Sequence, residues 1–133
     1  MLLERVPKDI LSKVYFCIIK IHIKGASIKK AELKLDEAKS VCKDESHIYR
    51  FKVLTAYIQL YKSNYSKYES YMKEALDYFY KNKNWTQVEI ICRELALYFE
   101  KRYKYKKSCQ YYKMAYELQL KECFYKNKDL YKH

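Results

Sequence analysis

Glycine and proline are almost absent from this sequence. Among 133 residues, Gly25 and Pro7 are the single examples, whereas an average protein contains roughly 7% glycine and 5% proline. β-Sandwiches and β-barrels need such turn residues after every short strand, so the shortage argues against both. It is typical of long helices joined by tight turns, and the sequence therefore predicts an all-α fold.

No apolar run is long enough to cross a membrane, and no secretory signal opens the sequence. The most apolar stretch, Val14 to Ile23, is interrupted by Lys20 and His22, and it is far shorter than the ~20 residues of a spanning helix. The cysteines form no Cys-x-x-Cys pair, and free thiols that pack as small hydrophobic groups suit a reducing compartment. We therefore expect a cytoplasmic protein that does not bind a membrane. The cysteines are Cys17, Cys42, Cys92, Cys109 and Cys123.

Patterns for catalysis and for metal or cofactor binding are also missing. His22, His47 and His133 are not spaced with cysteines or carboxylates as a metal site requires. No glycine-rich loop is present to hold a phosphate, and Glu94 and Glu100 face different sides of one predicted helix. We therefore expect no enzyme activity, no catalytic residue, no metal and no cofactor. A Cys–His pair assembled only in three dimensions stays open.

What the sequence does contain is an internal repeat. The segment Tyr65 to Leu76 returns 40 residues later as Tyr105 to Tyr116. Repeats of this length are helix pairs that stack on their neighbours to bury their apolar faces. Such an architecture favours partner binding over catalysis. A fainter copy lies upstream, at Ile28, Ala31, Leu35 and Ala38.

Apolar residues at three- and four-residue steps predict six helices. Ser66 with Glu69, and Asn84 with Gln87, have the spacing of capping boxes at two helix starts. Helical hairpins of equal length predict a right-handed solenoid of three hairpins. The expected helices are 8–23, 28–43, 46–61, 66–80, 84–102 and 106–125. They form hairpins at about 8–43, 46–80 and 84–125 in one domain, 1–125, followed by a C-terminal tail at 126–133.

The repeat resembles the tetratricopeptide (TPR) repeat. Leu95 and Ala96 match the pair at which the two helices approach closely, and Phe99 matches the aromatic position. Tyr68 departs from the pattern, because a small residue is usual there, and the spacing of 37 to 40 residues exceeds the roughly 34 of the standard repeat. Further matching positions are Tyr105, Ser108, Tyr112 and Ala115 in the last hairpin, and Phe51, Leu54, Thr55, Ile58, Tyr65, Met72 and Ala75 in the middle one.

The long spacing and bulky substitutions resemble the TPR domains of Gram-positive peptide-sensing regulators, the Rap/PlcR-like group. The runs Tyr78 to Trp85 and Glu94 to Glu100 carry this similarity. The output module that precedes the repeats in that group is not expected here. The resemblance implies a non-enzymatic adaptor or regulator that binds a peptide or a partner protein. It would be a truncated relative, a stand-alone repeat protein or an inhibitor of a larger protein.

A TPR stack lines its concave face with the first helix of each pair, and the resemblance places the partner site there. Arg93 or Lys52 would clamp a carboxylate, and Gln59 would pair with peptide backbone. The alternative is that these are ordinary half-exposed helix residues. The residues expected on the concave face are Tyr49, Lys52, Gln59, Ile90, Arg93, Leu97, Glu100 and Lys101, with Tyr15, Ile19 and His22 on the first helix.

The chain is strongly basic, with 28 Lys and Arg against 16 Asp and Glu and a net charge of +12. Such a field attracts nucleic acid or acidic protein surfaces, unless the lysines simply cover solvated faces. Seventeen tyrosines among the lysines keep a second function open, a basic helical protein whose rings stack on nucleic-acid bases. However, Tyr65, Tyr105 and Tyr112 are expected in the repeat core. An anion patch is expected beside Lys101 at Arg102, Lys104, Lys106 and Lys107.

Self-association is a third hypothesis. Stacked hairpins leave open ends, and an uncovered end exposes apolar surface that a second copy can bury. We expect any homo-oligomer to form through the C-terminal helix. Its apolar residues are Leu118, Leu120, Phe124 and Leu130.

Overall fold

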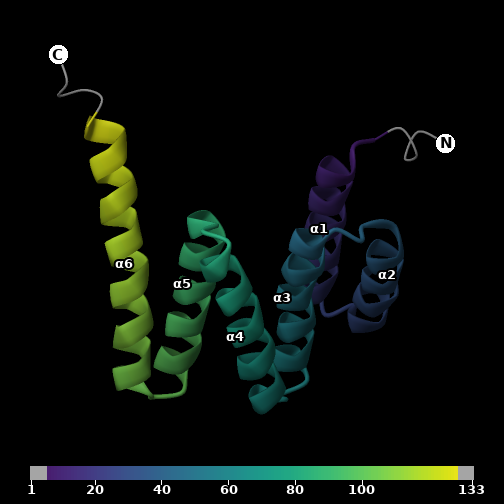
Figure 1. Ribbon diagram of the computed structural model, residues 1–133. Coiled ribbons are helices and arrows are strands. Elements are labelled where there is room, and N and C mark those ends of the chain that lie inside the picture. The colour runs from purple at the N-terminus through teal and green to yellow at the C-terminus, as the bar shows by residue number, and fades with distance from the viewer. Residues whose placement is uncertain (1–5, 129–133) are drawn as a thin grey trace. The chain divides into compact units, whose positions relative to one another are not determined.

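The computed structural model describes residues 6–128, with side chains described up to residue 121 (Figure 1). Within this range all regular secondary structure is α-helical, which confirms the predicted all-α fold of helical hairpins. Each predicted helix is present, with ends within a few residues of the expected ones. The helices are α1 (Lys8–Lys24), α2 (Ile28–Val41), α3 (Glu45–Tyr61), α4 (Tyr65–Lys81), α5 (Trp85–Lys101) and α6 (Tyr105–Lys128).

Two predicted helix starts have different outcomes. At α5, the Asn84 side chain accepts a hydrogen bond from the backbone N–H of Gln87 at 3.4 Å, so the predicted cap is confirmed. At α4, the helix begins at Tyr65, and Ser66 lies inside its first turn instead of before it. α6 continues to Lys128, three residues into the expected tail. Residues 129–133 lie outside the described range.

The same turn follows α1, α3, α4 and α5. The second residue after each helix has a left-handed φ of 59° to 62°. The next N–H donates to a carbonyl five residues earlier at 2.8 to 2.9 Å, which is the Schellman pattern that satisfies the last carbonyls of a helix. None of these residues is glycine, so each turn carries strain that a glycine would avoid. The left-handed residues are Ala26, Ser63, Lys83 and Tyr103.

Glycine is expected to stabilise such a turn. Lys83→Gly removes the Cβ that clashes in the left-handed region, and we expect the free energy of unfolding to rise by about 1 kcal/mol. Lys73→Gly, within the exposed face of α4, should lower it by about the same amount, because helix interiors disfavour glycine. Urea unfolding followed by circular dichroism measures both. Equal destabilisation by the two variants would contradict a left-handed residue at position 83.

The chain divides into two compact units, residues 1–75 and 76–133, with the division inside α4. Each is described by itself, and the single domain expected over 1–125 stays a prediction. In the first unit α1 packs against α2 and α3. Tyr15 and Ile19 are 8% and 0% exposed, so their expected place on a binding face is wrong. The core of this unit also contains Leu11, Ala31, Leu35, Ala38, Cys42, Phe51, Leu54 and Ile58.

The second unit is built on the packing of α5 against α6. Ala96 is fully buried, and its carbonyl accepts a hydrogen bond from the Ser108 hydroxyl at 2.8 Å. Small side chains at these two positions allow the helices to approach, as the TPR resemblance implied. Beside them, the Phe99 ring stacks on Tyr111 with centroids 5.7 Å apart.

The tyrosines expected in the repeat core are exposed. Tyr65, Tyr105 and Tyr112 are 38%, 58% and 38% exposed, so this prediction is wrong. Tyr65 and Tyr105 are the first residues of their helices. Because helical side chains lean towards the N-terminus of the helix, these two rings extend past the end of the helix and away from the packed interface. At the third position, Tyr111 takes the packing place beside Phe99. The buried tyrosine of α4 is Tyr68, at 1% exposure.

Candidate functional site

The predicted partner residues fall in both units. In the first, α3 carries Tyr49, Lys52 and Gln59, all half-buried. The Lys52 ammonium lies 5.2 Å from the centroid of the Tyr49 ring and pairs with Glu74 Oε2 at 2.6 Å. Gln59 Oε1 accepts a hydrogen bond from Asn64 Nδ2 at 2.8 Å. A ligand that uses Lys52 or Gln59 must therefore replace a partner that the protein already supplies.

In the second unit, α5 exposes one face opposite its core. Ile90 and Leu97 are each 45% exposed. On the opposite face of the helix, Val88, Cys92 and Leu95 are fully buried. Arg93 lies between them in the sequence, and its Nη2 pairs with Glu89 Oε1 of the same helix at 2.8 Å. Lys101 follows one turn later and is exposed. Steps of three and four residues place Ile90, Arg93, Leu97 and Lys101 on one side of the helix, and we call them the α5 strip.

Glu100 belongs to a different contact. Its Oε2 accepts a hydrogen bond from the Tyr112 hydroxyl of α6 at 3.1 Å. Desolvation and this hydrogen bond raise the pKa of Tyr112. The Glu100 carboxylate thus links α5 to α6, and it is engaged within the protein instead of extending the α5 strip.

The cations expected as an anion patch surround the turn between α5 and α6. Lys104 and Lys106 are exposed. The Arg102 guanidinium lies 5.6 Å from the centroid of the Tyr98 ring, and the Lys107 ammonium lies 5.3 Å from that of Phe99. Two of the four cations therefore pack on rings of α5, and anion binding by this patch stays a prediction.

A polar cluster joins α1 to α3 in the first unit. His47 is 4% exposed, and its Nε2 lies 2.8 Å from Asp9 Oδ1. Its Nδ1 lies 4.0 Å from Asp44 Oδ2. The three groups are of the kinds that hold a metal, but the two ring nitrogens face different carboxylates, and one ion binds only one of them. The arrangement suits a histidine that ties two helices together.

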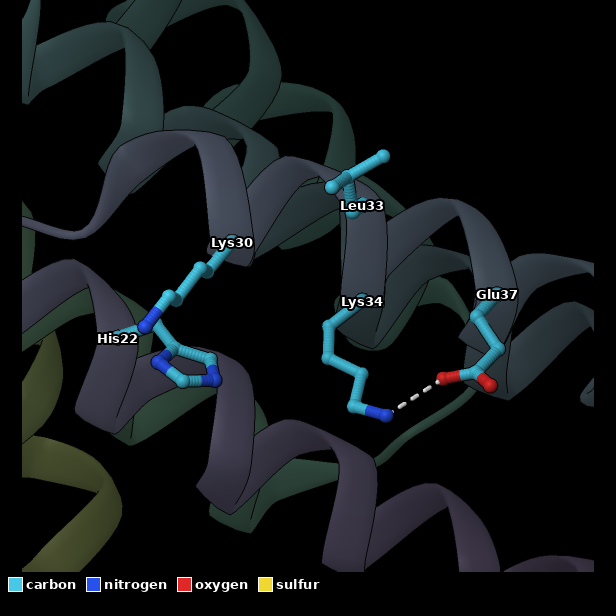
Figure 2. Close-up of a pocket in the computed structure, with 5 residues that line it drawn as sticks. All are labelled: His22, Lys30, Leu33, Lys34 and Glu37. Carbon is cyan, nitrogen blue, oxygen red and sulfur yellow. Dashed lines mark ion pairs between the residues drawn. The ribbon is translucent and has the colours of Figure 1, made fainter.

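A cleft of about 460 Å³ opens between α1 and α2. Figure 2 shows His22 and Lys30 at one end and the ion pair of Lys34 with Glu37 at the other. Lys34 Nζ lies 2.9 Å from Glu37 Oε2, and this hydrogen bond raises the pKa of Lys34. Leu33 also lines the cleft and is 71% exposed. Of the three residues expected to bind a ligand on the first helix, His22 lines this cleft, and Tyr15 and Ile19 are buried.

Sequence spacing missed both the cluster and the cleft. Asp9 and His47 are 38 residues apart, and nothing in the local pattern pairs them. The cleft combines a histidine of α1 with lysines of α2, which looked like solvated residues. One sequence feature did indicate a second surface on α1, because its apolar residues surround the helix instead of forming one stripe.

This chain is similar in sequence to a known regulator. The chain is similar to the transcriptional activator NprA of Geobacillus stearothermophilus, with 32% identity over 110 residues. The match covers 77% of this chain and 27% of NprA, so the chain spans about a quarter of that relative. No protein-family model matches the chain, and no solved structure matches it. The similarity is thus to a regulator of transcription.

The described helices include none with the length and apolar character that a membrane crossing requires.

The cysteines differ in their surroundings. Cys17 and Cys109 are exposed, whereas Cys42 and Cys92 are buried. Cys92 is fully buried, with its Sγ 3.2 Å from Met114 Sδ. Burial raises the pKa of the Cys92 thiol to about 11 and also raises the pKa of Cys42. These two thiols pack as small apolar groups.

Alkaline pH is expected to destabilise the second unit through Cys92. The folded thiol keeps its proton up to about pH 11, while a thiol in the unfolded chain loses it near its ordinary pKa of 9.0. The stabilisation is complete below the lower value and is lost as pH rises to the upper one, by at most about 3 kcal/mol. Urea unfolding across this range should show a shallower pH dependence in Cys92→Ala than in the wild type. Cys17→Ala, at an exposed position, should match the wild type, and equal slopes in all three proteins would contradict the prediction.

Proposed function

We propose that this chain is a non-enzymatic helical repeat module of a cytoplasmic regulator and that it binds a peptide or a partner protein. The observation that carries the proposal is the α5 strip, where two exposed aliphatic side chains flank an arginine. The similarity to a transcriptional activator supports a regulatory role. The resemblance to TPR domains of the Rap/PlcR-like group supports a peptide as the ligand.

The α5 strip offers the two kinds of contact that a short peptide needs. Ile90 and Leu97 lie two turns apart and can take apolar side chains of the ligand. Arg93 can bind a carboxylate in a bidentate manner. Its pair with Glu89 is partly exposed, and such pairs contribute about 0–1 kcal/mol, so a ligand can replace it. In the first unit, Tyr49, Lys52 and Gln59 of α3 offer an aromatic, cationic and amide set of their own.

Selection from a random peptide library displayed on phage tests the proposal. Peptides enriched on the wild-type protein should bind at least about tenfold more weakly to Leu97→Asp, because a charge is placed at the centre of the contact. Tyr116→Asp is the matched control, since Tyr116 is an exposed residue of α6, and it should bind like the wild type. No enrichment, or equal binding to all three proteins, would overturn the proposal.

Nucleic-acid binding is the second candidate, favoured by the net charge of +12. Exposed Lys104 and Lys106 at the turn after α5 would contact phosphates. Binding of this kind weakens log-linearly with salt, whereas peptide capture by apolar contacts does not. Fluorescence anisotropy of a labelled DNA duplex, titrated with the protein at several salt concentrations, distinguishes nucleic-acid binding from peptide binding. Submicromolar affinity at physiological salt would favour the nucleic-acid function.

Self-association through the C-terminal helix remains a third proposal, with a smaller surface than the sequence indicated. Leu118 is 9% exposed and is therefore used inside the protein, while Leu120 is 51% exposed. The side chain of Phe124 and all of Leu130 lie outside the described residues. A concentration-dependent dimer in sedimentation equilibrium, abolished by Leu120→Asp, would support it.

A further inference from the structure

The first helix carries a second apolar face that the core does not use. Ile10, Val14 and Ile21 are 53%, 44% and 67% exposed, and Cys17 is exposed as well. Their steps of four, three and four residues form the a/d pattern with which one helix packs along another. The opposite side of α1 is already buried in the core of the first unit. We call Ile10, Val14, Cys17 and Ile21 the α1 seam.

The α1 seam runs along the helix that also forms one side of the cleft between α1 and α2. His22 lines the cleft from the α1 side (Figure 2), and Ile21 of the seam points about 100° away from it around the helix. From the α2 side, Leu33 adds another exposed aliphatic side chain, at 71% exposure. The seam itself is an elongated apolar helix face, and such a face can pack along a second amphipathic helix.

The charges that border this surface are mostly positive. Lys13 and Lys24 of α1 and Lys30 of α2 are exposed, and Lys20 lies 5.9 Å from the centroid of the Phe16 ring. Of the nearby carboxylates, Glu37 pairs with Lys34, and Asp9 shares a hydrogen bond with His47. The surface therefore presents apolar groups bordered by positive charge, and it complements a helix with apolar residues and acidic flanks.

We propose that the α1–α2 hairpin docks an amphipathic helix of a partner protein, with apolar residues on the α1 seam and acidic residues towards the lysines. A second copy of the chain is a poorer occupant, because pairing two α1 seams would bring Lys13, Lys20 and Lys24 of both copies together. The surface uses residues separate from the α5 strip, so the chain would hold two partners or two parts of one.

Two designed helical peptides test this docking. Both carry leucine at the a and d positions of three heptads, and the flanking e and g positions are glutamate in one and lysine in the other. By fluorescence anisotropy the glutamate peptide should bind and the lysine peptide should bind at least about tenfold more weakly. Ile21→Asp should lower the affinity for the glutamate peptide by at least about tenfold, without changing the circular dichroism spectrum of the protein.

Leu97→Asp is the matched control, because it places the same charge on an exposed leucine of the α5 strip. It should leave binding of the glutamate peptide unchanged, which separates this surface from the proposed peptide site. Failure of the glutamate peptide to bind, equal binding of both peptides, or equal loss in both variants would overturn the proposal. The proposal would also be overturned if the wild type formed a dimer in the absence of peptide and Ile21→Asp abolished that dimer, because a second copy would then occupy the seam.

Discussion

Phe99→Ala is expected to unfold the second unit under conditions in which the wild type is folded. The Phe99 ring is 1% exposed and stacks on Tyr111 at 5.7 Å, with Tyr98 edge-on at 5.0 Å. Truncation leaves a cavity between α5 and α6, and buried Phe→Ala changes cost about 3–5 kcal/mol. This is a large part of the roughly 5–15 kcal/mol that stabilises a domain. Urea unfolding followed by circular dichroism measures the loss.

Tyr116→Ala is the control for Phe99→Ala. Tyr116 is an aromatic residue of α6 that is 60% exposed, and surface changes of this kind usually stay within about 0.5 kcal/mol. If both substitutions lower the free energy of unfolding by the same amount, the Phe99 ring does not hold α5 against α6.

Phe51→Ala should have a comparable effect on the first unit. Phe51 is fully buried in the cluster that joins α1, α2 and α3, in the company of Ile19 and Leu54. We again expect a loss of about 3–5 kcal/mol from transfer and cavity terms. Hydrogen exchange measured by mass spectrometry should show faster exchange in the amides of α1 to α3, because these helices share the damaged core.

Tyr61→Ala controls for the loss of an aromatic ring from α3, since Tyr61 is 55% exposed. Protection in α1 to α3 should match the wild type in this variant. Unchanged protection in Phe51→Ala itself would contradict the core described for the first unit.

The helices could be predicted because helix formation is largely local. One glycine, one proline and the repeated spacing were enough to place α1 to α6. The positions of Ala96 and Ser108 were also predictable, because small residues recur where two helices approach. The Schellman turns were not, since Ala26, Ser63 and Lys83 lack the glycine that usually marks them.

The surroundings of the candidate site residues depend on contacts that the sequence does not show. Ile90 and Leu97 are exposed on α5, as a binding face requires. Lys52, however, pairs with Glu74 of α4, 22 residues away, and no local pattern indicates this. Tyr15 was misplaced because both faces of α1 are apolar, and periodicity alone does not say which face the core takes.

The central claim is that this chain binds peptide or protein ligands through the α5 strip. Its most direct test is an anisotropy titration of one phage-selected peptide against wild type and Leu97→Asp, at low and at physiological salt. The claim predicts wild-type affinity that changes little with salt and a loss of at least about tenfold in the variant. Equal affinity of the two proteins, or wild-type binding that disappears at physiological salt, would contradict it.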